Sequence, residues 1–166
     1  MTPTGDEALR KLTVRVARRL RAAGEGLATA ESCTGGMLAK CLTDLPGSSA
    51  YFDRGWVTYS NVAKHEELRV EGRLLARYGA VSEEVALAMV RGAFKESHAH
   101  HAVAVTGITG PAGGSARKPV GTVWIGWGYR KHGRIRVHAT RFRFQGGRDA
   151  VRRQAVRAAL EGLAES

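Results

Sequence analysis

The chain has 166 residues, 43% of them hydrophobic, and this length fits one globular domain over residues 1–166 with a sizeable core. It contains no run of about 18 apolar residues, no apolar export signal and only two cysteines, Cys33 and Cys41, so we expect a soluble cytoplasmic protein without a disulfide framework. A formal charge of +11 indicates an anionic partner, either a nucleic acid or a phosphorylated small molecule, although much of the charge lies on segments typical of solvated helix faces.

The first third of the chain predicts a helix, a buried strand and a second helix. Apolar residues at helical spacing indicate an amphipathic helix from Asp6 to Ala23, and Gly24 ends it. Leu27–Ala30 is a short apolar run typical of a buried strand. It leads through a glycine-rich turn into a second helix, Met37–Leu45.

The remaining chain alternates strands with helices. Aromatic and β-branched residues predict strands, whereas 3.6-residue periodicity predicts helices, with Ser82 as the N-cap of one of them. In chain order we expect loop 46–49, strand 51–60, helices 63–68, 72–78 and 83–97, strands 101–106, 120–129 and 135–144, and helix 149–163. The strands 120–129 and 135–144 alternate like an antiparallel pair joined around His132-Gly133. This pattern favours a layered α/β domain with a mixed sheet.

A first candidate site follows the strand Leu27–Ala30. In α/β sheets, the loops at the carboxyl ends of strands converge on the ligand-binding crevice. Ser32 lies in such a loop, just before a helix whose N–H groups and positive dipole end would stabilise an oxyanion or a phosphate. Two readings stay open at this point: Ser32 is a nucleophile, or Ser32 and Thr34 are helix caps. Cys33 is a rival nucleophile, although a buried small hydrophobic residue is its commoner role.

A serine hydroxyl needs a base, and the segment Tyr59–Lys64 offers one. It lies where a strand turns into a helix, but a lysine acts as a base only if its pKa is far below about 10.4. Without that shift, Lys64 is an ordinary surface lysine. The histidines at positions 98, 100 and 101 form a candidate zinc cluster that lacks a companion carboxylate motif.

A second glycine-rich loop runs from Thr106 to Ser115 and continues to Lys118. It gathers glycines, hydroxyls and a cation, as phosphate-binding loops do, but its spacing is not that of a Walker A motif. Arg148 is a further candidate ligand for phosphate or carboxylate.

Five segments taken together resemble the nicotinamide mononucleotide deamidase family, which includes the C-terminal domain of CinA proteins. They occur in the family's order across nearly the whole chain: 30–36 (AESCTGG), 58–64 (TYSNVAK), 78–82 (YGAVS), 106–111 (TGITGP) and 118–123 (KPVGTV). The resemblance implies a three-layer α/β/α sandwich with a mixed, mostly parallel sheet. It also implies hydrolysis of nicotinamide mononucleotide to nicotinate mononucleotide and ammonia in pyridine nucleotide salvage, without a metal or organic cofactor, by a protein that self-associates.

The family's catalytic positions fall on Ser32, Tyr59 and Lys64. The implied chemistry is serine and lysine acyl transfer, in which Lys64 with Tyr59 manages the proton of Ser32. The positions that the resemblance assigns to substrate binding are Cys33, Thr34, Gly35, Gly36, Asn61, Thr106, Gly107 and Arg148. Backbone N–H groups between Cys33 and Gly36 are the expected oxyanion or phosphate donors.

The chain departs from the family pattern in the second loop, where Thr109 replaces the usual alanine and Ala112 is also unusual. The alternative function is a module that binds nucleic acid or a nucleotide phosphate without catalysis. Aromatic residues are few and are not interleaved with the basic runs, which argues against a single-strand nucleic-acid platform.

Overall fold

The computed structural model describes residues 5–165. The helices and strands follow the predicted order closely, with most bounds shifted by only a few residues. They are α1 (Asp6–Ala23), β1 (Leu27–Glu31), α2 (Met37–Thr43), β2 (Phe52–Val57), α3 (Asn61–Leu68), α4 (Gly72–Tyr78), α5 (Glu83–Lys95), β3 (His101–Gly107), β4 (Thr122–Lys131), β5 (Arg134–Arg143) and α6 (Arg148–Glu165). A short 3₁₀ helix, Ser48–Ala50, occupies part of a segment predicted as loop.

The five strands form one mixed sheet in the order β2-β1-β3-β4-β5. β1 pairs in parallel with both β2 and β3, whereas β3–β4 and β4–β5 are antiparallel. The sheet is therefore mixed as expected, but it is parallel in only two of four pairings and not mostly parallel. The β4–β5 hairpin closes as predicted at His132 and Gly133, both with positive φ, and the antiparallel β3–β4 pairing lowers the parallel share further.

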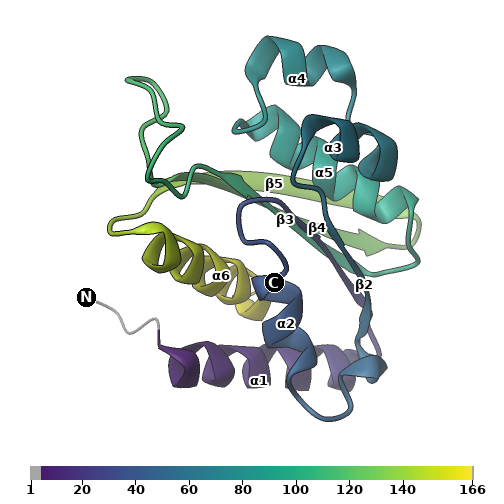
Figure 1. Cartoon of the computed structure of the whole chain (residues 1–166). Helices are drawn as coiled ribbons and strands as arrows, with labels where there is room; N and C mark the ends of the chain where they lie inside the picture. Colours follow the sequence, from purple (N-terminus) through teal and green to yellow (C-terminus); the bar gives the residue numbers. More distant parts are fainter. Residues whose placement is uncertain (1–4, 166) are drawn as a thin grey trace.

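Helices cover both faces of the sheet, as the three-layer expectation requires (Figure 1). α1, α2 and α6 lie on one face, and α3, α4 and α5 lie on the other. Each face has its own hydrophobic cluster. β1 is buried along its whole length because it lies between β2 and β3 in a sheet that helices cover on both faces. No helix among residues 5–165 has the length and apolar character needed to cross a membrane.

Close packing at Gly92 fixes α3 against α5. A Cβ atom at this position would lie 2.0 Å from the carbonyl oxygen of Leu68, the last residue of α3. Any larger residue would push the two helices apart. This contact places α3, and with it Lys64, directly over the carboxyl ends of the parallel strands.

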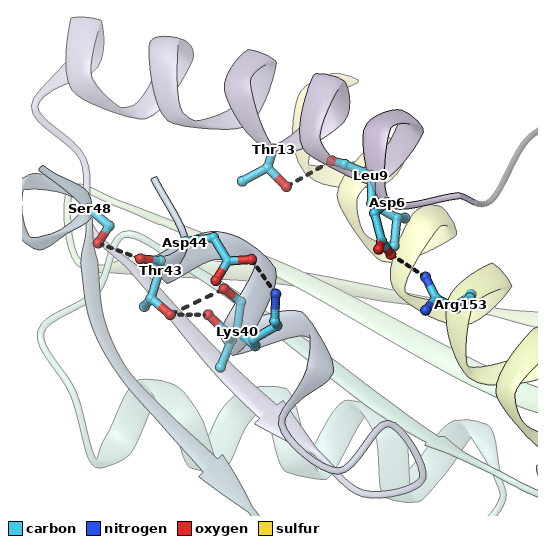
Figure 2. Close-up of polar contacts among 9 residues, drawn as sticks. Asp6, Leu9, Thr13, Lys40, Thr43, Asp44, Ser48 and Arg153 are labelled. Carbon is cyan, nitrogen blue, oxygen red and sulfur yellow. Dashed lines mark hydrogen bonds and ion pairs between the residues drawn. The ribbon is translucent and has the colours of Figure 1, made fainter. Parts of the chain in front are cut away.

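Several polar contacts lie within the helical layer of α1, α2 and α6 on the other face of the sheet (Figure 2). Arg153 of α6 forms an ion pair of 2.5 Å with Asp6 at the start of α1, and Lys40 of α2 pairs with Asp44, the C-cap of that helix. Thr13 is buried and donates to the carbonyl oxygen of Leu9. The ion pairs are largely exposed and contribute little to stability, so the apolar contacts among α1, α2 and α6 hold this layer.

His100 and His101, just before and at the start of β3, make contacts within the fold. His100 Nδ1 accepts a hydrogen bond of 3.0 Å from the N–H of Gly26. His101 is buried, and its Nε2 lies 2.7 Å from the Glu25 carboxylate, which also accepts from the hydroxyl of Tyr129. Among residues 5–165, no three His, Cys, Asp or Glu side chains form a metal-ligand set.

Acidification should weaken the fold through His101. Burial lowers the pKa of His101 below its ordinary value of 6.5, an effect that exceeds the opposing effect of its hydrogen bond to Glu25. Between the lowered pKa of folded His101 and the ordinary value of 6.5, the unfolded chain binds a proton that the folded chain does not. The free energy of unfolding is therefore highest above pH 6.5 and falls as the pH is lowered toward the pKa of folded His101. Urea unfolding at pH 7.5 and 5.5 measures this loss, which should be smaller in His101→Asn. Equal losses in both proteins would contradict the role of His101.

Candidate active site

The carboxyl ends of the three parallel strands bring the predicted site residues together. Glu31, the last residue of β1, is in register with Val57 of β2 and Val105 of β3. The residues that follow these three positions, Ser32, Thr58 and Thr106, therefore lie side by side at one edge of the sheet. This is the crevice that the order of strands in an α/β sheet predicts.

Lys64 reaches this edge from α3. The Ser60 hydroxyl caps the helix by accepting from the N–H of Ala63 at 3.0 Å, and the helix directs the Lys64 side chain inward. Lys64 Nζ lies 3.0 Å from Ser32 Oγ and 2.7 Å from the carbonyl oxygen of Thr58. Only 1% of Lys64 is exposed, so the reading of Lys64 as a surface lysine is wrong.

The environment of Lys64 favours the neutral amine. Burial lowers its pKa from the ordinary value of 10.5. An ion pair with a carboxylate would favour the charged form, but within residues 5–165 no ion pair involves Lys64. A neutral amine at hydrogen-bond distance from a serine hydroxyl can accept the hydroxyl proton.

A cleft of about 260 Å³ opens above Ser32 and Lys64. The predicted residues that line it are Ser32, Cys33, Tyr59, Lys64, Thr106, Gly107 and Arg148. Further lining residues, which the sequence did not single out as ligands, come from the α4–α5 connection and from the glycine-rich loop: Ala80, Val81, Ile108, Thr109, Gly110, Ala112 and Gly113. Among residues 5–165, no Asp or Glu lines the cleft, so the cleft suits an anionic ligand.

Arg148 is held rigidly at the rim of the cleft. Its Nη1 donates at 2.9 Å to both Thr109 Oγ1 and the carbonyl oxygen of Gly110. Its Nη2 donates at 2.6 Å to the hydroxyl of Tyr59. Thr109, one of the departures from the family pattern, thus has a defined contact. Tyr59 is 58% exposed and contacts Arg148, and no hydrogen bond within residues 5–165 joins it to Ser32 or Lys64.

Thr106 has a structural contact at the floor of the cleft. Its hydroxyl donates to the carbonyl oxygen of Ala80 at 2.9 Å and thereby ties the α4–α5 connection to the end of β3. Four predicted binding residues, in contrast, do not line the cleft: Thr34, Gly35, Gly36 and Asn61. Thr34 is buried, and Asn61 is exposed in the first turn of α3.

The N-terminus of α2 is occupied by a side chain that the sequence reasoning missed. The buried Glu31 carboxylate accepts hydrogen bonds from the N–H groups of Gly36, Leu38 and Ala39 at 3.1, 3.0 and 2.8 Å. The N–H groups of Gly35 and Gly36, which were expected to donate to a substrate oxyanion or phosphate, thus have acceptors within the chain. The side chains of Ser32 and Thr34 do not cap this helix, so that reading is wrong. One signal was visible: Glu31 is the only charged residue in the buried run 27–31.

Cys33 is a poor rival to Ser32. Only 4% of the residue is exposed, and burial raises the pKa of its thiol to about 12. The thiolate is therefore scarce at neutral pH. In contrast to Gly35, the N–H of Cys33 donates to no backbone carbonyl within residues 5–165, and Cys33 lines the cleft.

Comparison with known proteins shows the family of this chain. A family model described as the CinA C-terminal domain matches residues 9–166. The chain belongs to the CinA C-terminal domain family. Relatives in this family include the nicotinamide-nucleotide amidohydrolase PncC of Pseudomonas putida, which is 53% identical over 92% of both chains. The PncC of Escherichia coli K12 is 49% identical over 95% of this chain and 94% of its own.

Longer members of the CinA C-terminal domain family also match. A CinA-like protein of Syntrophobacter fumaroxidans is 50% identical over 93% of this chain, which spans only 35% of that relative. Among solved structures, competence damage-inducible protein A from Klebsiella pneumoniae has a TM-score of 0.89 at 42% identity, over 95% of this chain and 96% of its own. A competence/damage-inducible protein from Agrobacterium tumefaciens has the same TM-score at 45% identity, over 99% and 97%.

Proposed function

We propose that this chain is a nicotinamide-nucleotide amidohydrolase that converts nicotinamide mononucleotide and water into nicotinate mononucleotide and ammonia. The observation that carries the proposal is the 3.0 Å contact between Ser32 Oγ and the buried Lys64 Nζ, at the base of a cleft without carboxylates. The PncC relatives, named for this activity, support the choice of substrate because they match over nearly their whole length.

The reaction begins when neutral Lys64 accepts the proton of Ser32 and the serine oxygen attacks the carboxamide carbon. The resulting tetrahedral oxyanion accepts a hydrogen bond from the N–H of Cys33, which lines the cleft and donates to no backbone carbonyl within residues 5–165. Lys64 then returns the proton to the leaving nitrogen, the C–N bond breaks, and ammonia departs. This leaves a nicotinoyl ester on Ser32.

Hydrolysis of the ester completes the cycle. Lys64 takes a proton from a water molecule, which attacks the ester carbon, and the proton returns to Ser32 as the C–O bond breaks. No net proton or electron is needed from outside the site. The same lysine therefore serves both half-reactions.

Arg148 binds the substrate phosphate in this proposal. Among residues 5–165 it is the one arginine that lines the cleft, and its charge is permanent, whereas burial lowers the pKa of Lys64. Three hydrogen bonds fix the guanidinium and leave part of its donor edge for a ligand. Tyr59 then positions Arg148 at the rim, and Thr106 and Gly107 shape the floor beneath the pyridine ring.

Ammonia release from nicotinamide mononucleotide by the purified protein tests the function. Wild type should release ammonia in an amount equal to the nicotinate mononucleotide formed. Ser32→Ala should be folded and inactive, because it lacks the nucleophile. An inactive wild type that still binds the mononucleotide would replace this proposal with the non-catalytic nucleotide-binding alternative.

A further inference from the structure

Helix α2 follows the nucleophile loop, but its N-terminal donors are already used. The Glu31 carboxylate accepts from Gly36, Leu38 and Ala39. The N–H of Gly35 donates to the carbonyl oxygen of Ser32 at 3.0 Å, and that of Met37 donates to the carbonyl oxygen of Thr34 at 3.1 Å. Every N–H from Gly35 to Ala39 thus has an acceptor within the chain.

Glu31 is held firmly at the end of β1. Its carbonyl oxygen accepts from the N–H of Thr58 at 2.8 Å, so the backbone is fixed to the β2 side of the sheet. The next N–H, that of Ser32, donates to Val105 at 2.9 Å on the β3 side. The residue is fully buried. Its side chain therefore bridges from the strand to the helix across the loop 32–36, which carries the nucleophile.

We propose that Glu31 is a positioning residue: its carboxylate serves as a built-in anion at the N-terminus of α2 and holds Ser32 within reach of Lys64. The expected effect on kcat rests on the proposed amidohydrolase function, whereas the expected position of Ser32 does not. Because the carboxylate occupies the positive end of the helix, substrate anions are directed to Arg148 instead.

Glu31→Gln is the sharpest test because it keeps the shape of the side chain and removes its charge. The amide presents an NH₂ group where the carboxylate had an oxygen, so at least one helix N–H faces a donor and loses its acceptor. The loop should then shift. A displacement of about 1 Å at a reacting atom reduces the rate by about 100-fold.

The matched control is Tyr51→Phe. The buried Tyr51 hydroxyl donates to the carbonyl oxygen of Leu42 near the other end of α2, so this variant also removes one buried hydrogen bond from the same helix. Both variants should have a lower Tm. Only Glu31→Gln should lose about 100-fold in kcat, with KM for nicotinamide mononucleotide unchanged within about twofold. Equal kcat values in the two variants would overturn the proposal.

Crystal structures of wild type and Glu31→Gln give a readout that does not depend on activity. We expect the Ser32 Oγ to Lys64 Nζ contact in wild type and a separation beyond about 3.5 Å in the variant. A serine that does not move in Glu31→Gln would overturn the positioning role of Glu31. A wild type that is inactive on the mononucleotide would refute only the proposed function, and the structural test would still apply. If Glu31→Gln does not fold, Glu31→Asp replaces it, because aspartate keeps the charge and has a shorter side chain. Full kcat in Glu31→Asp would overturn the proposal.

Discussion

Lys64→Met should reduce kcat for ammonia release from nicotinamide mononucleotide by about 100- to 10,000-fold, the usual contribution of a general base. Methionine has a similar length and fits a buried site, but it cannot accept the proton of Ser32. Lys64→Arg should be equally inactive because a guanidinium stays protonated. The exposed Lys40, which pairs with Asp44 on α2, offers a control, since Lys40→Met should retain wild-type activity.

The pH dependence of the wild type gives a second measure of Lys64. The base must be neutral, so kcat/KM should rise with pH through the pKa of Lys64 and then level off. Because burial lowers that pKa from 10.5, the plateau should begin below the pH at which an exposed lysine titrates. A substantial rate in Lys64→Met would refute the role of Lys64. A wild-type kcat/KM that does not change with pH below the titration of an exposed lysine would refute it as well.

Arg148→Ala should raise KM for nicotinamide mononucleotide by about 10- to 100-fold, because a hydrogen-bonded charge contributes about 1.5–3 kcal/mol. Nicotinamide riboside, which lacks the phosphate, is the matched substrate. Wild type should prefer the mononucleotide strongly, and Arg148→Ala should lose most of that preference.

Thr109→Ala is the control for Arg148, since it removes one of the three contacts to the guanidinium and keeps the charge. We expect a smaller change in KM than in Arg148→Ala, because the guanidinium keeps its charge and its contacts to Gly110 and Tyr59. If Arg148→Ala weakens the mononucleotide and the riboside equally, Arg148 does not bind the phosphate.

Much of the fold is readable in the sequence because it depends on local patterns. Periodicity, the cap at Ser82 and the glycine that ends α1 concern residues within a few positions of one another. Alternation and the turn at His132-Gly133 also revealed the β4–β5 hairpin, but the parallel share of the sheet was overestimated, since a local pattern does not show that β4 pairs antiparallel with the distant β3. The strand-to-loop position of Ser32 was also readable, and it placed Ser32 at the crevice.

The sequence by itself determined the order of helices and strands, the glycine-rich loops and, through a resemblance, the candidate nucleophile and base. Only the tertiary structure decided which groups meet. The contacts between Ser32 and Lys64 and between Tyr59 and Arg148 join positions 32 and 89 residues apart, and they exist because β1 lies between β2 and β3. The tertiary structure likewise decided that Glu31, and not a ligand, fills the N-terminus of α2. A buried carboxylate must find donors, and the nearest ones are the N–H groups of that helix.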